Sequence, residues 1–214
     1  MIENHILEQL VEQSAWCQRN WDLSKSIPER DIETFKYIVK TCPSKQNRVF
    51  YKAVFIQDRD IIERIHNTSD SFTARYDPHV YISNPQILAN LVIVLVSDRD
   101  YSERARTGVE YDMGIVDGKD NTKNKIAKQD EEKSVGIAIG YLALAANILG
   151  YRTGVYNAQH RSHETKKILD IDHDDIISMI GIGYHNHDKN IRQHHYDDRI
   201  TYPSFEKSIE VIDK

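Results

Sequence analysis

Cysteine is scarce in this sequence: the 214 residues contain two, Cys17 and Cys42. Two cysteines are too few for a disulfide framework, and they form neither a Cys-x-x-Cys pair nor a Cys/His spacing typical of zinc sites. The N-terminus, residues 1–5, carries no basic stretch leading into an apolar run, so we expect no signal peptide. These absences favour a reducing, cytoplasmic location.

Long apolar runs and an excess of one charge are also missing. The longest apolar stretch with a strand-like pattern, residues 91–96, is far shorter than the roughly 20 residues that a membrane helix needs. Lys and Arg number 28 and Asp and Glu number 33, which gives a formal net charge of -5. A nucleic-acid binder needs a strongly basic face, so the sequence argues against nucleic acid and against a membrane as partners.

The glycine-rich and metal-binding motifs of common enzyme families are absent. Residues 136–140 and 181–183 contain glycine pairs but lack the spacing of a dinucleotide-binding loop, and there is no P-loop or nucleophile elbow. The acidic run at 170–175 lacks the glycine and the distal glutamate of a calcium loop. We interpret this run and the histidines within residues 185–195 as solvated surface, and expect no metal.

Helical periodicity and capping signals mark the N-terminal half of the chain. We expect a helix over residues 2–18, a second from a capping box of Ser26 and Glu29 to the residue before Pro43, and a short third capped by Asp58. Runs of β-branched and apolar residues predict strands at residues 49–57, 91–96, 152–156 and 177–183. The strand at 91–96 is apolar throughout, so it should be central and buried on both faces.

A helix expected over residues 134–149 is apolar almost all round, which predicts burial on every side. Small residues along it let another backbone come close: Gly136, Gly140, Ala143 and Ala146. It is either a core helix of one chain or one that also packs against a second subunit, and Gly150 ends it. The long polar segment before it, about residues 98–133, is either a lid or a solvated insertion in a single domain spanning 1–214.

Four separated segments carry a more specific signal. The first is Trp-Cys-Gln-Arg-Asn-Trp at residues 16–21, and the second is Cys-Pro-Ser-Lys-Gln-Asn at 42–47, just before a predicted strand. The third is Asn84, and the fourth joins the apolar helix to a strand that ends in Val-Tyr-Asn-Ala at 155–158. In this order, over residues 15–205, they resemble the nitroreductase family of FMN-dependent enzymes.

In the first segment, Arg19 and Trp21 match the last arginine and the aromatic residue of the family's Arg-Arg-Ser-x-Arg-x-Phe opening. Cys17 stands where the family has serine, and Ala15 and Trp16 stand where basic residues are usual. The resemblance implies that Trp16, Cys17 and Arg19 contact FMN, with Arg19 facing its phosphate. The alternatives are a surface ion pair for Arg19, a small buried thiol for Cys17 and a core role for the tryptophans.

The second segment matches the family's Ala-Pro-Ser-Ser-x-Asn turn at Pro43, Ser44 and Asn47, with Lys45 in place of a serine. The resemblance implies that this turn contacts a flavin bound mainly by the other subunit. Asn84 is placed like a family asparagine that hydrogen-bonds the pyrimidine edge of the flavin. Its alternative role is that of a turn former before a proline.

Asn157 and Ala158 match by position the family residues whose backbone N–H groups approach flavin N5. Arg199 falls near the family's basic residues that bind the FMN phosphate, although Asp197 replaces a lysine of the family there. Arg199 can also be a surface ion-pair residue. Lys45 is a further cation that a dianionic phosphate could use.

The resemblance implies an α+β fold with a mixed, mainly antiparallel sheet flanked by helices, in a homodimer with two sites at its interface. It implies an oxidoreductase in which FMN takes electrons from NAD(P)H and passes them to a nitroaromatic, a quinone or a flavin-like acceptor. Since the cofactor supplies the redox chemistry, we nominate no catalytic acid, base or nucleophile. The alternatives are a non-catalytic flavin- or ligand-binding protein with an altered FMN site, and a branch that consumes the flavin as substrate.

Overall fold

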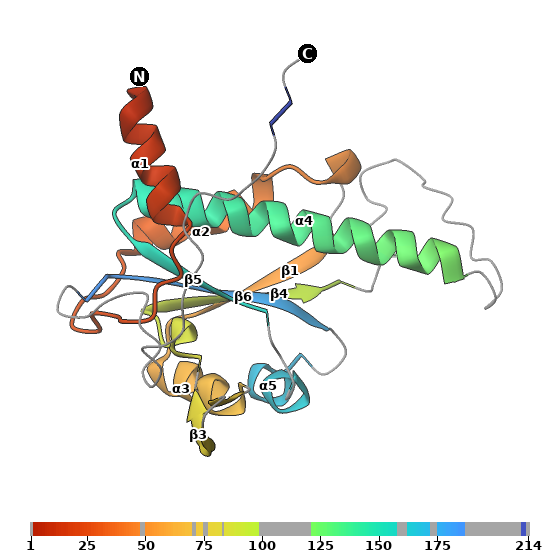
Figure 1. Cartoon of the computed structure of the whole chain (residues 1–214). Coiled ribbons are helices and arrows are strands. Elements are labelled where there is room, and N and C mark those ends of the chain that lie inside the picture. The colour runs from red at the N-terminus through yellow and green to blue at the C-terminus, as the bar shows by residue number, and fades with distance from the viewer. Residues whose placement is uncertain are drawn as a thin grey trace.

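Among the described residues, four strands form one antiparallel sheet in the order β1-β4-β6-β5 (Figure 1). The computed structural model describes residues 2–47, 50–69, 72–74, 77–82, 84–98, 121–157, 162–171, 175–186 and 211–212. The strands are β1 (Tyr51–Ile56), β4 (Leu91–Ser97), β5 (Arg152–Tyr156) and β6 (Ile176–Gly183). Each confirms a strand that the sequence predicts.

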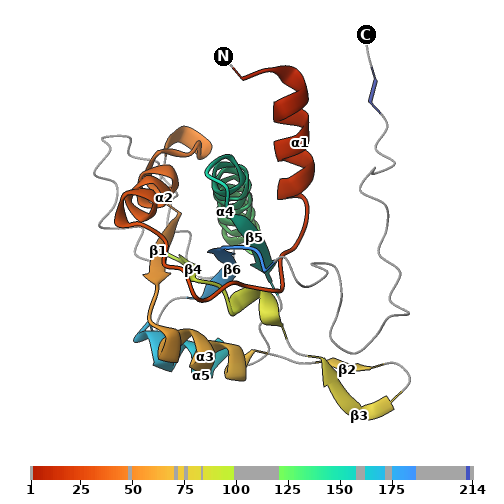
Figure 2. The same cartoon turned by 90° about the vertical axis from the view of Figure 1, so that its left-hand side faces the viewer.

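Helices cover both faces of this sheet (Figure 2). α2 (Glu29–Thr41) and α4 (Asn121–Ile148) lie on one face, and α3 (Arg59–Thr68) and α5 (Ser162–Leu169) lie on the other. α1 (Asn4–Ser14) stands beside the C-terminal end of α4 (Figure 1). The shorter elements are β2 (Phe72–Ala74), β3 (Asp77–Ile82) and the 3-10 turns η1 (Lys45–Asn47) and η2 (Pro85–Ile87). No helix within the described part of the chain has the length and apolar character needed to cross a bilayer.

The core has two halves, one on each face of β4. Every residue of β4 is buried, as the sequence predicts. Because successive side chains of a strand point to opposite faces, Leu91, Ile93 and Leu95 join the half beneath α2 and α4, and the three valines of β4 join the half against α3 and α5. Full burial of each such side chain contributes about 1.5–3 kcal/mol, so β4 anchors both layers.

The helix caps follow the prediction in one case and not in another. The capping box expected from Ser26 and Glu29 is wrong, because α2 begins at Glu29 directly behind Pro28 and no side chain caps it. The cap expected for α3 is confirmed, since Asp58 Oδ1 accepts a hydrogen bond from the Ile61 N–H at 3.1 Å. Proline suits the start of α2 because its missing N–H would have no partner there.

α4 departs from prediction in two ways. Residues 121–133 are helical and not part of a loop, in keeping with the Lys, Gln, Glu and Ala residues that favour helix there. Residues 99–120, the rest of the predicted lid or insertion, lie outside the described residues. Within the single chain the helix is not buried on every side, because Tyr141 is 51% exposed and Ile148 is 48% exposed, and the alternative of packing against a second subunit stays a prediction. The end of the helix is as predicted, with Gly150 at a φ of 88°.

Two glycines let η2 lie directly on the sheet. A Cβ on Gly181 of β6 would overlap the Gln86 carbonyl oxygen and sit 2.9 Å from Ala89 Cβ, and a Cβ on Gly154 of β5 would sit 2.6 Å from Gln86 Cβ. Protein interiors are packed too tightly to absorb such overlaps, so a side chain at either glycine would move η2. Asn84 immediately precedes η2, and the two glycines therefore set the depth at which it lies.

Gly181→Ala should destabilise the fold, because the added methyl group displaces η2 from the sheet. We expect the free energy of unfolding to fall by about 1–3 kcal/mol, the usual cost of overpacking. Urea denaturation followed by circular dichroism measures the change. A loss smaller than about 0.5 kcal/mol, the range of ordinary surface substitutions, would contradict the close packing of η2 on β6.

Candidate functional site

Residues 17–21 are not the end of a helix: Cys17 and Gln18 pair with β5, and Asn20 and Trp21 pair with residues just beyond β6. α1 ends at Ser14, so the helix expected to continue to Gln18 is shorter than predicted. The Gln18 N–H donates to the Thr153 carbonyl at 2.7 Å, and Cys17 forms a parallel bridge with Thr153. Pairing with β5 satisfies backbone groups at an otherwise open sheet edge, and this long-range gain overrides the local helical pattern.

Side-chain burial alternates over residues 17–20, and Trp21 after them is buried as well. Gln18 and Asn20 are buried, whereas Cys17 and Arg19 are half-buried, as expected where successive residues of an extended chain point in opposite directions. The prediction named Cys17 and Arg19 and missed the two buried amides. The sequence could have indicated their burial only if the segment had been treated as extended, because alternate side chains of an extended chain then point inward.

Cys17 and Arg19 lie close together, and each makes a polar contact with a backbone carbonyl. Cys17 Sγ lies 4.0 Å from the Val155 carbonyl oxygen, and burial raises the pKa of the thiol, opposed by the Arg19 guanidinium. A protonated, half-buried thiol with a raised pKa is a poor nucleophile, in line with a structural role for Cys17. The Arg19 guanidinium donates to the Cys17 carbonyl at 3.2 Å. Since a guanidinium has five N–H donors, that bond is compatible with an anionic ligand.

A second pair of buried amides comes from η2 and the residue before it. Asn84 and Gln86 are both buried, and Gln86 Nε2 donates to Asn84 Oδ1 at 3.5 Å. The Trp21 indole N–H donates to the Pro85 carbonyl at 2.8 Å, which ties η2 to the 17–21 segment. Amide side chains carry both donors and acceptors, the chemistry that recognises the edge of a heteroaromatic ring, but Gln18 Nε2 already donates to the Asn20 carbonyl and Gln86 Nε2 to Asn84. Of the four buried amides, the sequence predicted Asn84 alone.

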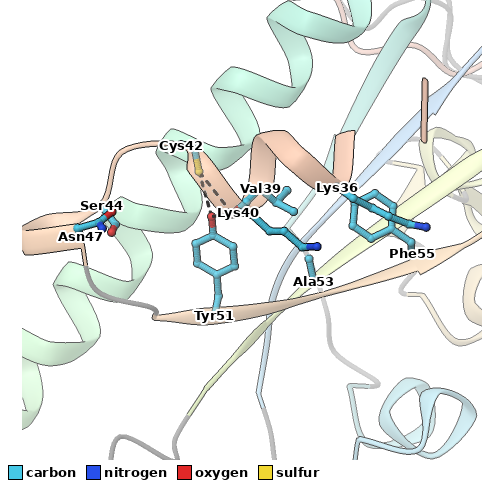
Figure 3. Close-up of a pocket in the computed structure, with 9 residues that line it drawn as sticks. All are labelled: Lys36, Val39, Lys40, Cys42, Ser44, Asn47, Tyr51, Ala53 and Phe55. Atoms are coloured by element: carbon cyan, nitrogen blue, oxygen red, sulfur yellow. Dashed lines mark hydrogen bonds between the residues drawn. The ribbon is translucent and has the colours of Figure 1, made fainter. Parts of the chain in front are cut away.

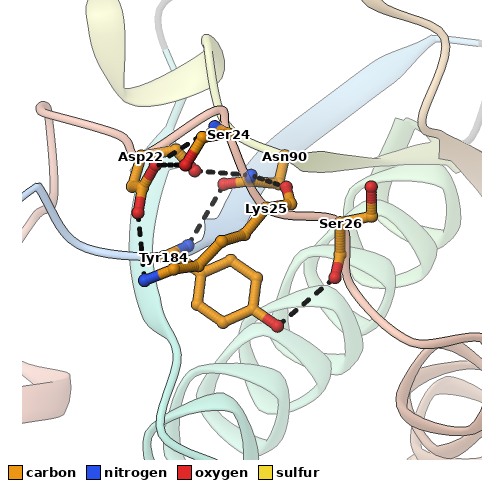
Figure 4. A network of polar contacts seen from close by, with 6 residues as sticks. All are labelled: Asp22, Ser24, Lys25, Ser26, Asn90 and Tyr184. Atoms are coloured by element: carbon orange, nitrogen blue, oxygen red, sulfur yellow. Dashed lines mark hydrogen bonds and ion pairs between the residues drawn. The ribbon is translucent and has the colours of Figure 1, made fainter.

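A polar network fixes the loop at residues 22–26, which follows the extended segment (Figure 4). Asn90 Nδ2 donates to the backbone carbonyls of Asp22 at 2.9 Å and Lys25 at 2.8 Å. Asn90 Oδ1 accepts from the Tyr184 N–H at 3.1 Å, just beyond β6. The Asn90 side chain therefore holds both the loop at residues 22–26 and the end of β6 in place. This also fixes the 17–21 segment, which leads directly into the loop.

The predicted residues after β5 are only partly described. Asn157 Oδ1 accepts a hydrogen bond from the Ser178 hydroxyl at 2.5 Å, so its side chain is held against β6. Asn157 lies at the opposite end of β5 from the 17–21 segment. Ala158 and Arg199 lie outside the described residues, and their roles at flavin N5 and at the phosphate stay predictions.

The turn at residues 43–47 is closed by a backbone hydrogen bond. The Asn47 N–H donates to the Ser44 carbonyl at 3.1 Å, and Asn47 has a φ of 55°, a left-handed conformation that asparagine tolerates. Lys45 forms an ion pair with Asp130 of α4, with 2.6 Å between Nζ and Oδ2. Its proposed contact with a phosphate stays a prediction, and in this structure Asp130 compensates its charge.

A cavity of about 510 Å³ opens between α2 and β1, next to this turn (Figure 3). Ser44 and Asn47 line it together with residues of α2, β1 and their connection: Lys36, Val39, Lys40, Cys42, Tyr51, Ala53 and Phe55. The Tyr51 hydroxyl donates to the Val39 carbonyl at 3.0 Å and contacts Cys42 Sγ at 3.1 Å. We call this space the α2–β1 cavity. Its volume is in the range of small-molecule sites.

The two groups of candidate residues lie near different halves of α4. Lys45 contacts Asp130 in the N-terminal half of the helix, whereas Cys17 pairs with Thr153 just beyond its C-terminal end. From Asp130 to Ile148 the helix spans roughly 27 Å, at 1.5 Å per residue. A single chain therefore does not bring the turn at 43–47 and the 17–21 segment into one site.

The histidines and acidic residues form no metal centre in the part of the chain that is described. His185 pairs with Trp21 through the backbone, and residues 187–200 lie outside the description. Within the described ranges, no three His, Cys, Asp or Glu side chains come close enough to hold a metal ion.

Comparison with known proteins identifies the fold. No family model matches the sequence, and no curated protein matches it. A nitroreductase-like protein from Streptococcus mutans has a TM-score of 0.63 at 16% identity, covering 99% of this chain and 100% of that one. A nitroreductase family protein from Clostridium novyi NT has a TM-score of 0.60 at 16% identity, covering 90% and 92%. An FMN-dependent nitroreductase from Clostridium difficile R20291 has a TM-score of 0.57 at 12% identity, covering 91% and 99%.

These matches extend over nearly the whole of both chains in each pair. The described elements are helices around an antiparallel sheet, so the predicted α+β class is confirmed. The resemblance that the four sequence segments carry is confirmed at the level of architecture: the chain has the nitroreductase fold.

Proposed function

We propose that the chain is an FMN-dependent oxidoreductase that takes electrons from NAD(P)H, passes them to a nitroaromatic, quinone or flavin-like acceptor, and works as a homodimer. The observation that supports this best is the division of the candidate residues between the two halves of α4. On a fold shared with an FMN-dependent nitroreductase, that division is the one expected for sites built from two subunits.

The residues present fit an FMN molecule. The buried amides near Asn84 suit the pyrimidine edge of the ring, which carries both an N–H donor and carbonyl acceptors. Arg19 and Arg199 suit the phosphate, because a guanidinium binds phosphate through paired N–H bonds. Asn157 and Ala158 would offer backbone N–H groups near N5. Bound FMN supplies the electron transfer, and the chain's own residues bind and orient it, so we propose no catalytic acid or base.

An exposed apolar stripe along α4 supports the homodimer. Ile137, Tyr141 and Ile148 lie on one face of the helix and are all exposed. Gly136 and Gly140 beside them are open, because a Cβ at either position meets no atom within 4 Å. α1 carries further exposed apolar side chains at Ile6, Leu7 and Val11, and Ile2 just before it is exposed as well. Contiguous exposed apolar surface of this kind is typical of a protein interface.

Antiparallel packing of two such stripes would complete the sites. A two-fold axis across α4 sets the N-terminal half of one helix beside the C-terminal end of the other. The turn at 43–47 of one copy would then meet the 17–21 segment and η2 of its partner, and the same contact would recur on the other side of the axis. Pro43 of one copy would supply an apolar wall for a ring held by the other.

A specific observation favours a second candidate function, a flavin- or ligand-binding protein without catalysis. Lys45 is paired with Asp130 at 2.6 Å, and Cys17 presents a half-buried thiol where the family has a serine hydroxyl. Both features reduce the groups available to a phosphate. This alternative keeps the fold and the dimer but binds a ligand without redox turnover.

The protein should retain flavin. After incubation with excess FMN and gel filtration, we expect a stoichiometric yellow complex that NADH or NADPH bleaches and that a quinone or nitroaromatic reoxidises. Visible absorption spectra measure each step. Retained flavin that NAD(P)H does not bleach would favour the non-catalytic alternative, whereas a folded protein that retains none would rule out FMN as its cofactor.

Arg199→Ala should weaken FMN binding by about 1.5–3 kcal/mol, the range for a hydrogen bond to a charged group. Fluorescence titration of FMN into the apoprotein measures the affinity. Lys167→Ala is the control, because this exposed lysine lies on α5, across the sheet from α4. An unchanged affinity in Arg199→Ala would remove Arg199 from the site.

Tyr141→Asp should convert the dimer to monomers at micromolar concentration, since an interface does not tolerate an unpaired buried carboxylate. Flavin retention should fall with dimerisation if each site needs both copies. Analytical ultracentrifugation and flavin absorbance report the two effects. Tyr37→Asp is the matched control, because Tyr37 is 66% exposed on α2, away from the α4 stripe. A dimer that survives Tyr141→Asp would show that the stripe is not the interface.

A further inference from the structure

The floor of the α2–β1 cavity is one face of β1. Tyr51, Ala53 and Phe55 alternate along the strand, so their side chains point to the same face, toward α2. At about 3.3 Å per residue, the two aromatic residues lie roughly 13 Å apart along β1. Ala53 is the small side chain between them, and it leaves room for a flat ring with an aromatic side chain at each end.

Lys40 extends from the last turn of α2 toward this floor (Figure 3). Among the described residues it has no ion-pair partner within 4.0 Å, and its side chain is exposed. Lys36, one turn earlier, is different: its Nζ lies 2.6 Å from Glu33 and 3.6 Å from Glu29, so its charge is compensated. Lys40 is therefore the cation that a ligand in the cavity can use.

Nothing in the described lining repels an anion. None of the described residues that line the cavity is acidic. Burial, and then the contact with Cys42, raises the pKa of the Tyr51 hydroxyl, so the ring is neutral at physiological pH. The Tyr51 hydroxyl is already directed at the Val39 carbonyl, which leaves the ring itself as an apolar wall.

We propose that the α2–β1 cavity binds a planar aromatic carboxylate, with its ring on Ala53 between Tyr51 and Phe55 and its carboxylate at Lys40. The volume of about 510 Å³ accommodates a ligand of one or two fused rings. Ser44 and Asn47 line the same cavity, so the ligand would lie next to the turn that is proposed to contact flavin. On the proposed function, on which this last step rests, the favoured electron acceptor is an aromatic acid.

Naphthoate and its neutral isostere naphthamide test the site directly. Isothermal titration into the oxidised protein, without NAD(P)H, should show about fivefold tighter binding of the acid at low salt, with the preference shrinking as salt rises. Lys40→Met should abolish the preference and leave naphthamide affinity unchanged, whereas Lys40→Arg should keep it. Ala53→Leu, which fills the floor, should weaken both ligands at least tenfold. Lys167→Met is the control for a lysine in the last turn of another helix.

Several outcomes would overturn the site. Equal affinities for the acid and the amide would do so, as would a preference that persists in Lys40→Met. Binding that is unchanged in a folded Ala53→Leu variant would also exclude the cavity as its location. If Ala53→Leu fails to fold, the comparison of Lys40→Met with Lys40→Arg still decides the question, since Lys40 is exposed on the surface of α2.

Turnover separates this inference from the proposed function. The flavin-loaded protein should reduce para-nitrobenzoate with a higher kcat/KM than para-nitrobenzamide, and Lys40→Met should remove the difference. Equal rates in a protein that NAD(P)H bleaches would overturn the acid preference and leave the oxidoreductase standing. Naphthoate binding by a protein that holds no flavin would overturn the oxidoreductase and leave the binding site standing.

Discussion

β4 is buried on both faces along its whole length, and this burial decides where the other elements lie. A strand whose every residue leaves water needs a layer of helices on each side, which α2 and α4 supply on one face and α3 and α5 on the other. The inward side chains of α4 cover one face of β4. Its outward stripe, with Tyr141 and Ile148, then has nothing within the described chain to cover it. The proposed dimer interface is thus a consequence of covering β4.

Local sequence signals predict the structure correctly wherever a residue's conformation depends on its near neighbours. The sequence predicts the Asp58 cap and the Gly150 helix end, and each is set by adjacent backbone. It also predicts β5 with its observed bounds from a run of β-branched and aromatic residues, although the strand itself is held by pairing with β6. The extended form of residues 17–21 instead comes from the hydrogen bond between Gln18 and Thr153, which are far apart in sequence. A short stretch of sequence around residue 18 does not contain Thr153. The helical periodicity of that stretch therefore predicts a helix where the chain is extended.

The same limit applies to the candidate site. Resemblance to a family selects Lys45 and the turn around it, and charge alone makes Lys45 attractive to a phosphate. Whether that charge is available depends on Asp130, which reaches Lys45 because residues 121–133 continue α4. A sequence interpretation that treats those residues as a loop cannot place Asp130. The buried amides Gln18 and Gln86 were missed for a related reason, since their burial depends on glycines of other strands.

The turn at 43–47 would belong to both proposed sites, and this would couple them. Ser44 and Asn47 line the α2–β1 cavity, and the same turn is proposed to touch a flavin held by the partner copy. The ion pair that joins it to α4 is partly exposed and contributes about 0.2–1 kcal/mol, comparable to the net contribution of the backbone hydrogen bond from Asn47 to Ser44, so both help to position the turn. A ligand seated in the cavity and a flavin held by the partner copy would both contact this turn, which would bring the two close together. The choice of acceptor and the placement of the flavin would therefore both depend on this one short turn. Its shape is set by hydrogen bonds within the chain, and the flavin that it contacts would be held by the second subunit.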